Sequence, residues 1–222
     1  MPQSGLVAFD LDGTLQAECR SSWELLHRKL GLWDPDGKDY LDSYLRNEID
    51  YFELCRRDAS LWKGMPIADL RCELADVQLI DGADEVGSVL HKMGHSLALI
   101  STGVDILAED VARRLGFDYC VSNHILTDQG MVTGDVEILV PWDGKGEVLE
   151  RLQQQHGISM CDTVSIGDSG ADIPMFERSG LSIAVDPTVD LEQSGIADAV
   201  LSGRDFVQVL RLISDSNGRH DR

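Results

Sequence analysis

Five short apolar runs, spread along the 222-residue chain, restrict its possible folds more than any other feature. They are rich in Val, Ile, Leu and Ala, which is typical of buried parallel strands. Amphipathic helical patterns lie between them, such as residues 104–116, where the apolar side chains share one face and Gly116 supplies a stop. This alternation predicts an α/β fold, a doubly wound (Rossmann-like) parallel sheet with ligands at the carboxyl ends of its strands. The runs are 6–9, 97–100, 163–166, 181–185 and 199–201.

The stretch from residue 16 to residue 85 breaks the alternation, because it contains no run of strand character. Its apolar residues recur at helical spacing in segments bounded by Gly, Pro or Asp. A helical insert after the first strand would lie over that strand's carboxyl end. We therefore expect a small helical cap domain at 16–85 and a core domain made of 1–15 and 86–222. Residues 122–140 alternate in strand fashion, which predicts an antiparallel excursion from the sheet.

The charge balance argues against several classes of partner. Lys+Arg 19 against Asp+Glu 39 gives a formal net charge of −20, so the surface repels nucleic-acid backbones and anionic membranes. No apolar run approaches the roughly 20 residues of a transmembrane helix, and the start shows no signal-peptide pattern, so we expect a cytoplasmic protein. Asp outnumbers Glu by 27 to 12 and Arg outnumbers Lys by 14 to 5. That balance indicates a halophilic protein, although an acidic protein from ordinary salt has the same signature.

Neither the cysteines nor the histidines have the spacing of a metal site. The five cysteines are scattered and form no CxxC pair, so we expect free, buried thiols. The six histidines are interpreted as structural or surface residues.

Two carboxylates, Asp10 and Asp12, come directly after the first apolar run in FDLDGTL. At this spacing, on a Gly-Thr turn, both can face the crevice at the strand's carboxyl end. One of them can then serve as a nucleophile and the other as an acid or base. A turn rich in Asp is the structural alternative for the pair alone.

Polar residues with complementary chemistry follow two other apolar runs and begin one predicted helix. Ser101 and Thr102 offer a hydroxyl and backbone N–H groups for a phosphate oxygen. Lys145 stands between two glycines at a predicted helix start, where a cation opposes the helix dipole and a structural lysine is unusual. Asp168 and Asp172 lie at another strand end and its turn. Together these residues predict an oxygen-ligand Mg²⁺ site that receives a phosphoryl group.

Four ordered motifs carry a resemblance to a known family. FDLDGTL, ISTG, DGKGEVL and IGDSGADIPMF resemble the motifs of the haloacid dehalogenase superfamily. The resemblance covers nearly the whole chain. The helical insert and the TGDVE segment are similar to the phosphoserine phosphatase branch.

The resemblance implies a role for each matching position. Asp10 would be the nucleophile that forms an aspartyl-phosphate, and Asp12 would protonate the leaving oxygen and later activate water. Mg²⁺ would be held by the Asp10 carboxylate, the backbone carbonyl of Asp12 and Asp168, with Asp172 in the outer shell. Ser101 and Lys145 would hold the phosphoryl oxygens, and Lys145 would also offset the repulsion between nucleophile and substrate.

The predicted cap departs from the pattern of the phosphoserine phosphatase branch. That branch binds the substrate's carboxylate with a cap arginine and its ammonium with a cap glutamate. Here the two positions hold Asp58 and Cys19. Nearby residues that could substitute as substrate contacts are Glu18, Arg20, Arg56 and Arg57, and the fourth motif has Ala171 in place of an asparagine. The cap aromatics, among them Trp23, Tyr51 and Trp62, are interpreted as the core of a helical bundle.

The resulting hypothesis is a Mg²⁺-dependent phosphatase of a small phosphorylated metabolite, with phosphoserine as leading candidate. Sugar phosphates and phosphoglycolate are alternative substrates, and phosphotransfer to an acceptor alcohol is an alternative reaction through the same aspartyl-phosphate. A signalling receiver phosphorylated on aspartate is the non-enzyme alternative, but it has no need of a helical lid. The oligomeric state and the choice between Mg²⁺ and Mn²⁺ stay open at this point.

Overall fold

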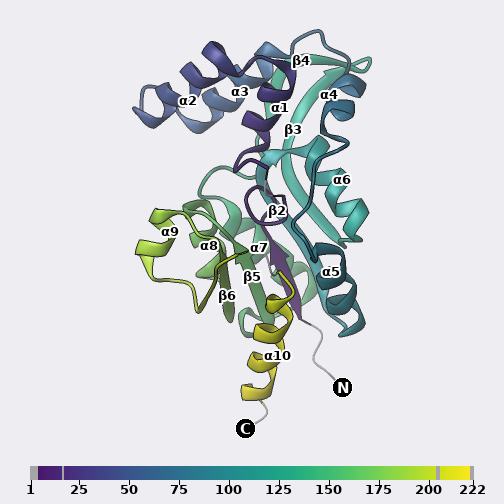
Figure 1. Ribbon diagram of the computed structural model, residues 1–222, viewed down its shortest axis with the longest axis vertical. Coiled ribbons are helices and arrows are strands. Elements are labelled where there is room, and N and C mark those ends of the chain that lie inside the picture. The colour runs from purple at the N-terminus through teal and green to yellow at the C-terminus, as the bar shows by residue number, and fades with distance from the viewer. Residues whose placement is uncertain (1–4, 17, 204–205, 221–222) are drawn as a thin grey trace.

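A seven-stranded sheet with helices on both faces forms the body of the computed structural model, which describes residues 5–16, 18–203 and 206–220 (Figure 1). The strand order is β4-β3-β2-β1-β5-β6-β7, and all neighbours are parallel except β3 and β4. The predicted doubly wound sheet is confirmed, and each of the five apolar runs lies in a strand. The strands are β1 (Leu6–Phe9), β2 (Ser96–Val104), β3 (Tyr119–Asp128), β4 (Met131–Glu137), β5 (Thr163–Gly167), β6 (Leu181–Val185) and β7 (Ala199–Leu201).

Strand β1 shows why these runs are apolar throughout. Its four residues are fully buried, because Val7 and Phe9 face one helical layer while Leu6 and Ala8 face the other. On one side the sheet is covered by α5 (Ala83–Lys92), α6 (Asp105–Leu115) and α10 (Gln208–His220), and on the other by α7 (Lys145–His156), α8 (Ile173–Phe176) and α9 (Val189–Ser194). Helix α6 stops at the predicted Gly116, whose φ of 75° is left-handed.

Four helices and the β3–β4 hairpin form a separate layer above the carboxyl ends of the strands (Figure 1). The hairpin is the predicted antiparallel excursion, and β4 packs against α3. Ser21 caps α1 and Asp50 caps α3, each side chain accepting a backbone N–H from three residues ahead. The helices are α1 (Ser22–Leu30), α2 (Lys38–Leu45), α3 (Tyr51–Leu61) and α4 (Ile67–Leu74), and a short π-helical turn spans Trp33–Gly37.

The predicted cap boundary at 85/86 falls inside a helix. Helix α5 begins at Ala83 and contacts β2 and α10, so it belongs with the sheet. We propose that the cap ends before α5. Residues 1–4, 17, 204–205 and 221–222 of the predicted domains lie outside the described residues.

The cysteines are free, as predicted, but the expectation that they are buried is wrong for three of them. Cys55 is buried and Cys19 is half-buried, whereas Cys72, Cys120 and Cys161 are exposed. Scattered spacing excludes a metal site but does not say which face of an element a residue occupies. Among the described residues, no helix is long and apolar enough to cross a membrane.

Candidate active site

The carboxyl ends of three neighbouring strands bring the predicted core residues together. Because β2, β1 and β5 are adjacent and parallel, Ser101 in the carboxyl-terminal half of β2, Asp10 after β1 and Asp168 after β5 share one edge of the sheet. Lys145 begins α7 and points into this edge, and Asp172 ends the short 3-10 turn Gly170–Asp172. All five side chains are almost completely buried.

Lys145 is the cation at the centre of this cluster. Its Nζ donates to Asp10 Oδ1 and to Asp172 Oδ1, at 2.5 Å each. Burial lowers the pKa of Lys145, but the charges of Asp10 and Asp172 raise it by a larger amount. The net shift is upward, so the side chain stays charged. Gly146 allows this position, because a Cβ there would meet the Pro174 carbonyl oxygen and push α7 away from α8. The unusual lysine between two glycines is thereby explained.

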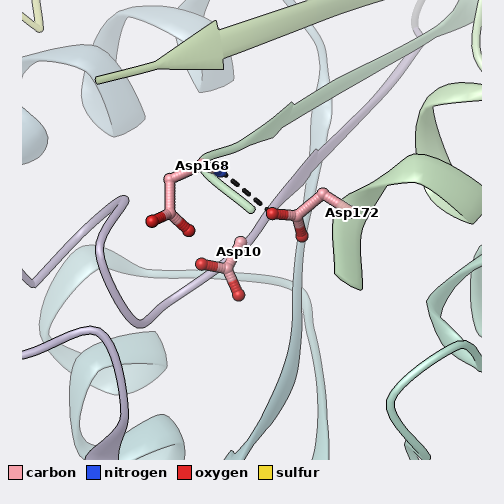
Figure 2. A group of neighbouring side chains, drawn as sticks. All are labelled: Asp10, Asp168 and Asp172. Carbon is pink, nitrogen blue, oxygen red and sulfur yellow. Dashed lines mark hydrogen bonds between the residues drawn. The ribbon is translucent and has the colours of Figure 1, made fainter. Parts of the chain in front are cut away.

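Three carboxylates, Asp10, Asp168 and Asp172, place oxygens within 4.8 Å of one another (Figure 2). Burial and the neighbouring carboxylates raise the pKa of Asp168 to about 9, and they raise the pKa of Asp10 to about 7 although Lys145 acts in the opposite direction. Among the described side chains, Asp10 Oδ2 and Asp168 Oδ1 are buried and accept no hydrogen bond. Two buried carboxylate oxygens without partners are the donor set that a divalent cation needs.

Asp172 supports the cluster from behind. Its Oδ2 accepts the backbone N–H groups of Asp168 at 2.9 Å and of Ser169 at 3.0 Å, and the first of these bonds is drawn in Figure 2. Its other oxygen accepts from Lys145. Both oxygens are therefore engaged, and Asp172 fixes the loop that carries Asp168. Close packing also requires Gly13, whose φ is 88° and whose added Cβ would collide with the Asp168 carboxylate.

Asp12 has a different environment, because it faces the start of the cap. Its Oδ2 accepts from the backbone N of Ser22 at 2.8 Å and from the Ser22 hydroxyl at 2.7 Å, and its Oδ1 accepts from Gln16 Nε2 at 2.8 Å. Burial raises the pKa of Asp12, and these hydrogen bonds oppose the shift. The Ser22 hydroxyl also accepts from Val104 N at 3.0 Å, which ties α1 to β2. Sequence reasoning missed Ser22 and Gln16.

The two predicted phosphate-binding residues on β2 differ in what they offer. Ser101 is fully buried, and its hydroxyl accepts from Gly103 N at 2.9 Å. The carbonyl oxygen of Thr102 accepts three hydrogen bonds, from Tyr51 Oη at 2.7 Å, from an Asn123 amide at 2.9 Å and from Trp23 Nε1 at 3.1 Å. Thr102 thus anchors cap side chains to the core, and Asn123 is a further residue that sequence reasoning missed.

Of the predicted substrate contacts in the cap, the structure brings only Arg20 to the site. Arg20 donates to the Asp168 carboxylate and to the Asp186 carbonyl oxygen. Glu18 is exposed and accepts the backbone N–H of Gln78. Arg56 and its neighbour Arg57 both bind Glu53 on the surface of α3.

A cavity of about 460 Å³ lies between the strand ends and the cap. Asp12, Arg20 and Thr102 line it from the core side, and Asp58 lines it from α3. The interpretation of Trp23 and Tyr51 as bundle core is incomplete, because both also line the cavity, whereas Trp62 is fully buried as predicted. The aromatic residues in its wall are Trp23, Trp33, Tyr44, Tyr51 and Trp142.

Fold and site together define a hydrolase of the haloacid dehalogenase-like class. Residues 7–177 match the haloacid dehalogenase-like hydrolase family, and the chain belongs to that family. The resemblance to its phosphoserine phosphatase branch is confirmed, and with it the expected class of enzyme, a phosphoric monoester hydrolase.

Three relatives illustrate this kinship. The chain is 30% identical over 209 residues to a phosphoserine phosphatase of Methanocaldococcus jannaschii, a match that covers 94% of this chain and 97% of that protein. It is similar, with a TM-score of 0.81 and 30% identity over 95% of this chain and 99% of the other, to a structure of a phospho-aspartyl intermediate analogue of phosphoserine phosphatase. A substrate-bound phosphoserine phosphatase complex gives a TM-score of 0.82 and 29% identity, over 96% of this chain and 99% of the other.

Proposed function

We propose that this chain is a cytoplasmic, Mg²⁺-dependent phosphatase that hydrolyses a small phosphomonoester through an aspartyl-phosphate on Asp10. The observation that carries the proposal is the buried arrangement of Asp10, Lys145 and Asp168, in which one carboxylate oxygen of Asp10 is held by Lys145 and the other has no partner among the described side chains. Such a carboxylate has one unpartnered oxygen for the metal ion and a second oxygen that Lys145 orients for attack on phosphorus.

Mg²⁺ would be held by the Asp10 carboxylate, Asp168 and the backbone carbonyl of Asp12, with Asp172 in the outer shell. The unpartnered oxygens of Asp10 and Asp168 support this assignment. A divalent cation would offset the repulsion between the carboxylates and the cost of burying their charge, which together raise the two pKa values. When bound, the ion supplies positive charge that neutralises the phosphoryl oxygens.

The residues of the chain carry out two displacements. An oxygen of Asp10 attacks phosphorus while the bond from phosphorus to the substrate oxygen breaks, and Asp12 gives its proton to that departing oxygen. Asp12 then takes a proton from water, which attacks the aspartyl-phosphate, so that phosphate leaves and Asp10 is regenerated. Lys145, Ser101 and the backbone N–H of Thr102 hold the phosphoryl oxygens throughout.

Phosphoserine heads the candidate substrates because the relatives carry its name. Sugar phosphates and phosphoglycolate follow, and phosphotransfer to an alcohol uses the same first displacement. The receiver alternative receives no support, since the family that matches is a hydrolase family.

The test is phosphate release from p-nitrophenyl phosphate and phosphoserine with Mg²⁺ or with EDTA, at low and at molar salt. We expect Mg²⁺-dependent release that the Asp10→Asn variant reduces by a factor of about 10³ or more, with an unchanged circular dichroism spectrum. Asp84→Asn, a change at an exposed residue of α5, is the matched control. A folded Asp10→Asn enzyme that still turns over in a Mg²⁺-dependent way would exclude Asp10 as the nucleophile.

A further inference from the structure

The cap side of the cavity contains a buried carboxylate, Asp58, that accepts a hydrogen bond from a histidine, which in turn is oriented by a tryptophan. Asp58 on α3 is 5% exposed, and its Oδ1 lies 3.0 Å from His27 Nε2. Trp62 Nε1 lies 3.2 Å from His27 Nδ1. Because an indole N–H can only donate, Nδ1 must accept, so the proton of the neutral imidazole is on Nε2 and points to Asp58. Burial raises the pKa of Asp58, and the hydrogen bond from His27 opposes this shift by favouring the ionised form.

The second oxygen of Asp58 is left for a ligand. Within the described part of the chain, Oδ2 accepts no hydrogen bond, and the side chain lines the cavity. The one described cation in the cavity wall is Arg20, which donates to Asp168 and Asp186 at the core end. The arginines adjacent to Asp58 in sequence are held by Glu53. The negative charge of Asp58 therefore has no cationic partner among these residues.

Aromatic rings line the cavity that Asp58 shares with Asp12. Tyr51 and Trp23 are fixed by their hydrogen bonds to the Thr102 carbonyl oxygen. Tyr44 contacts Tyr51 edge-on at 6.1 Å between ring centroids, and Trp142 contacts Tyr51 at 6.4 Å. Aromatic faces together with the Asp58 carboxylate attract the ammonium group of an organic ligand. The carboxylate group of a ligand would be repelled in the same place.

On this basis, and resting on the proposed phosphatase function, we infer that Asp58 forms a subsite for a primary ammonium group and that the substrate is the phosphomonoester of an amino alcohol without a carboxylate. The free Oδ2 of Asp58 accepts a hydrogen bond that a primary ammonium can donate. The phosphoserine phosphatase branch carries its carboxylate-binding arginine at the position of Asp58. Asp58 would attract the ammonium group of phosphoserine and repel its carboxylate.

The inference is tested with three substrates of nearly equal size on the full-length enzyme with Mg²⁺. O-Phosphoethanolamine has the ammonium alone, propyl phosphate has neither charge, and phosphoserine has both. We expect kcat/KM for phosphoethanolamine to exceed each of the other two by at least tenfold. A smaller preference over either compound, in an enzyme that hydrolyses p-nitrophenyl phosphate, would overturn the inference. If the enzyme hydrolysed none of the four compounds, p-nitrophenyl phosphate included, the proposed phosphatase function would be overturned instead.

A pair of variants assigns the preference to Asp58. Asp58→Asn keeps the size of the side chain and removes its charge, and we expect it to lower the ratio of kcat/KM for phosphoethanolamine to that for propyl phosphate at least fivefold. Asp69→Asn changes an exposed carboxylate of α4 that does not line the cavity and should leave the ratio within twofold. A folded Asp58→Asn enzyme with the wild-type ratio would exclude the subsite. If Asp58→Asn does not fold, the comparison of wild-type substrates decides the matter alone.

Discussion

On the core wall of the cavity the polar groups are held by the ends of buried strands, whereas on the cap wall they are carried by side chains on helices. The core wall comprises Asp12, which lines the cavity, together with the buried cluster of Asp10, Lys145, Asp168 and Asp172, and hydrogen bonds to the main chain or to buried partners fix its carboxylates. The cap wall includes aromatic rings, aliphatic side chains and the carboxylates of Asp58 and Glu24, and it meets the core through the Thr102 carbonyl oxygen. This division places the reacting carboxylates at the strand ends and the groups that can contact the rest of the substrate on the cap, and Ser22 of α1 links the two at Asp12.

Replacing Lys145 by Met should have the largest effect, because it leaves two buried carboxylates without their cation. Breaking a buried ion pair costs about 3–5 kcal/mol in the free energy of unfolding, and loss of a group that stabilises the phosphoryl oxygens reduces kcat by a factor of about 10² to 10³. Urea unfolding and steady-state kinetics measure the two effects. Lys63→Met, at an exposed lysine that does not line the cavity, is the matched control. If Lys145→Met were as stable and as active as Lys63→Met, the central role of Lys145 would be wrong.

Replacing Asp12 by Asn tests whether the core wall supplies the proton. The amide keeps the shape of the side chain but cannot transfer a proton, so hydrolysis of an alkyl phosphate should slow by a factor of about 10² or more. Hydrolysis of p-nitrophenyl phosphate, whose leaving group needs no proton, should slow much less. Values of kcat/KM for the two substrates measure the difference, because they report the first displacement and not the later hydrolysis of the aspartyl-phosphate that both substrates share. Equal losses on both would argue against the acid role of Asp12.

Mg²⁺ should stabilise the fold more at high pH than at low pH. The pKa values of Asp10 and Asp168 are raised from the ordinary value of 3.8 to about 7 and about 9. At a pH between 3.8 and these raised values, the folded metal-free protein therefore binds more protons than the unfolded chain. Its stability therefore falls as the pH rises through this window. Bound Mg²⁺ replaces those protons, and at a concentration of 100 times its Kd it adds about 2.7 kcal/mol.

Thermal unfolding with Mg²⁺ or with EDTA, at pH 5.5 and at pH 8, measures this effect. We expect a larger increase in Tm on adding Mg²⁺ at pH 8. Asp168→Asn, which removes one proposed ligand, should reduce the increase at pH 8, and Asp198→Asn, at an exposed carboxylate that is hydrogen-bonded to Ser182 of β6, should not. An identical increase at both pH values would contradict the assignment of these carboxylates as ligands.

The core wall could be predicted from the sequence because each of its residues follows a recognisable strand or begins a recognisable helix. Asp10 and Asp168 come after apolar runs, and parallel strands place such positions at one edge. The partners of Asp12 could not be predicted in this way. Ser22 reaches Asp12 only because the chain turns back after β1, and that path depends on how α1 packs against β2.

The cap wall could be predicted only as helices. The sequence shows Asp58 as a departure from a family pattern, but not its contact with His27, which lies 31 residues away in the sequence. Trp62, directly after α3, donates a hydrogen bond to the same histidine. Helical periodicity places a side chain on a face, whereas the neighbouring helix decides whether that face meets a cavity. The exposed Glu18 and Arg56 show the same limit, since both are near the expected positions in sequence and neither lines the cavity.

Replacing Arg56 by Ala should have the smallest effect. The variant tests whether residues on the outer surface of the cap contribute to substrate binding. Arg56 is bound to Glu53 and is 41% exposed, and an exposed pair of this kind contributes about 0.2–1 kcal/mol to stability. Because its side chain does not line the cavity, KM for every phosphomonoester should stay within about twofold of wild type, and Glu53→Gln should behave alike. Arg20→Ala is the contrasting variant, since Arg20 lines the cavity and contacts Asp168. A KM increase with Arg56→Ala on phosphoserine alone would mean that the helix turns this arginine inward when a carboxylate is bound, and the cap wall would then recognise both charges of an amino acid.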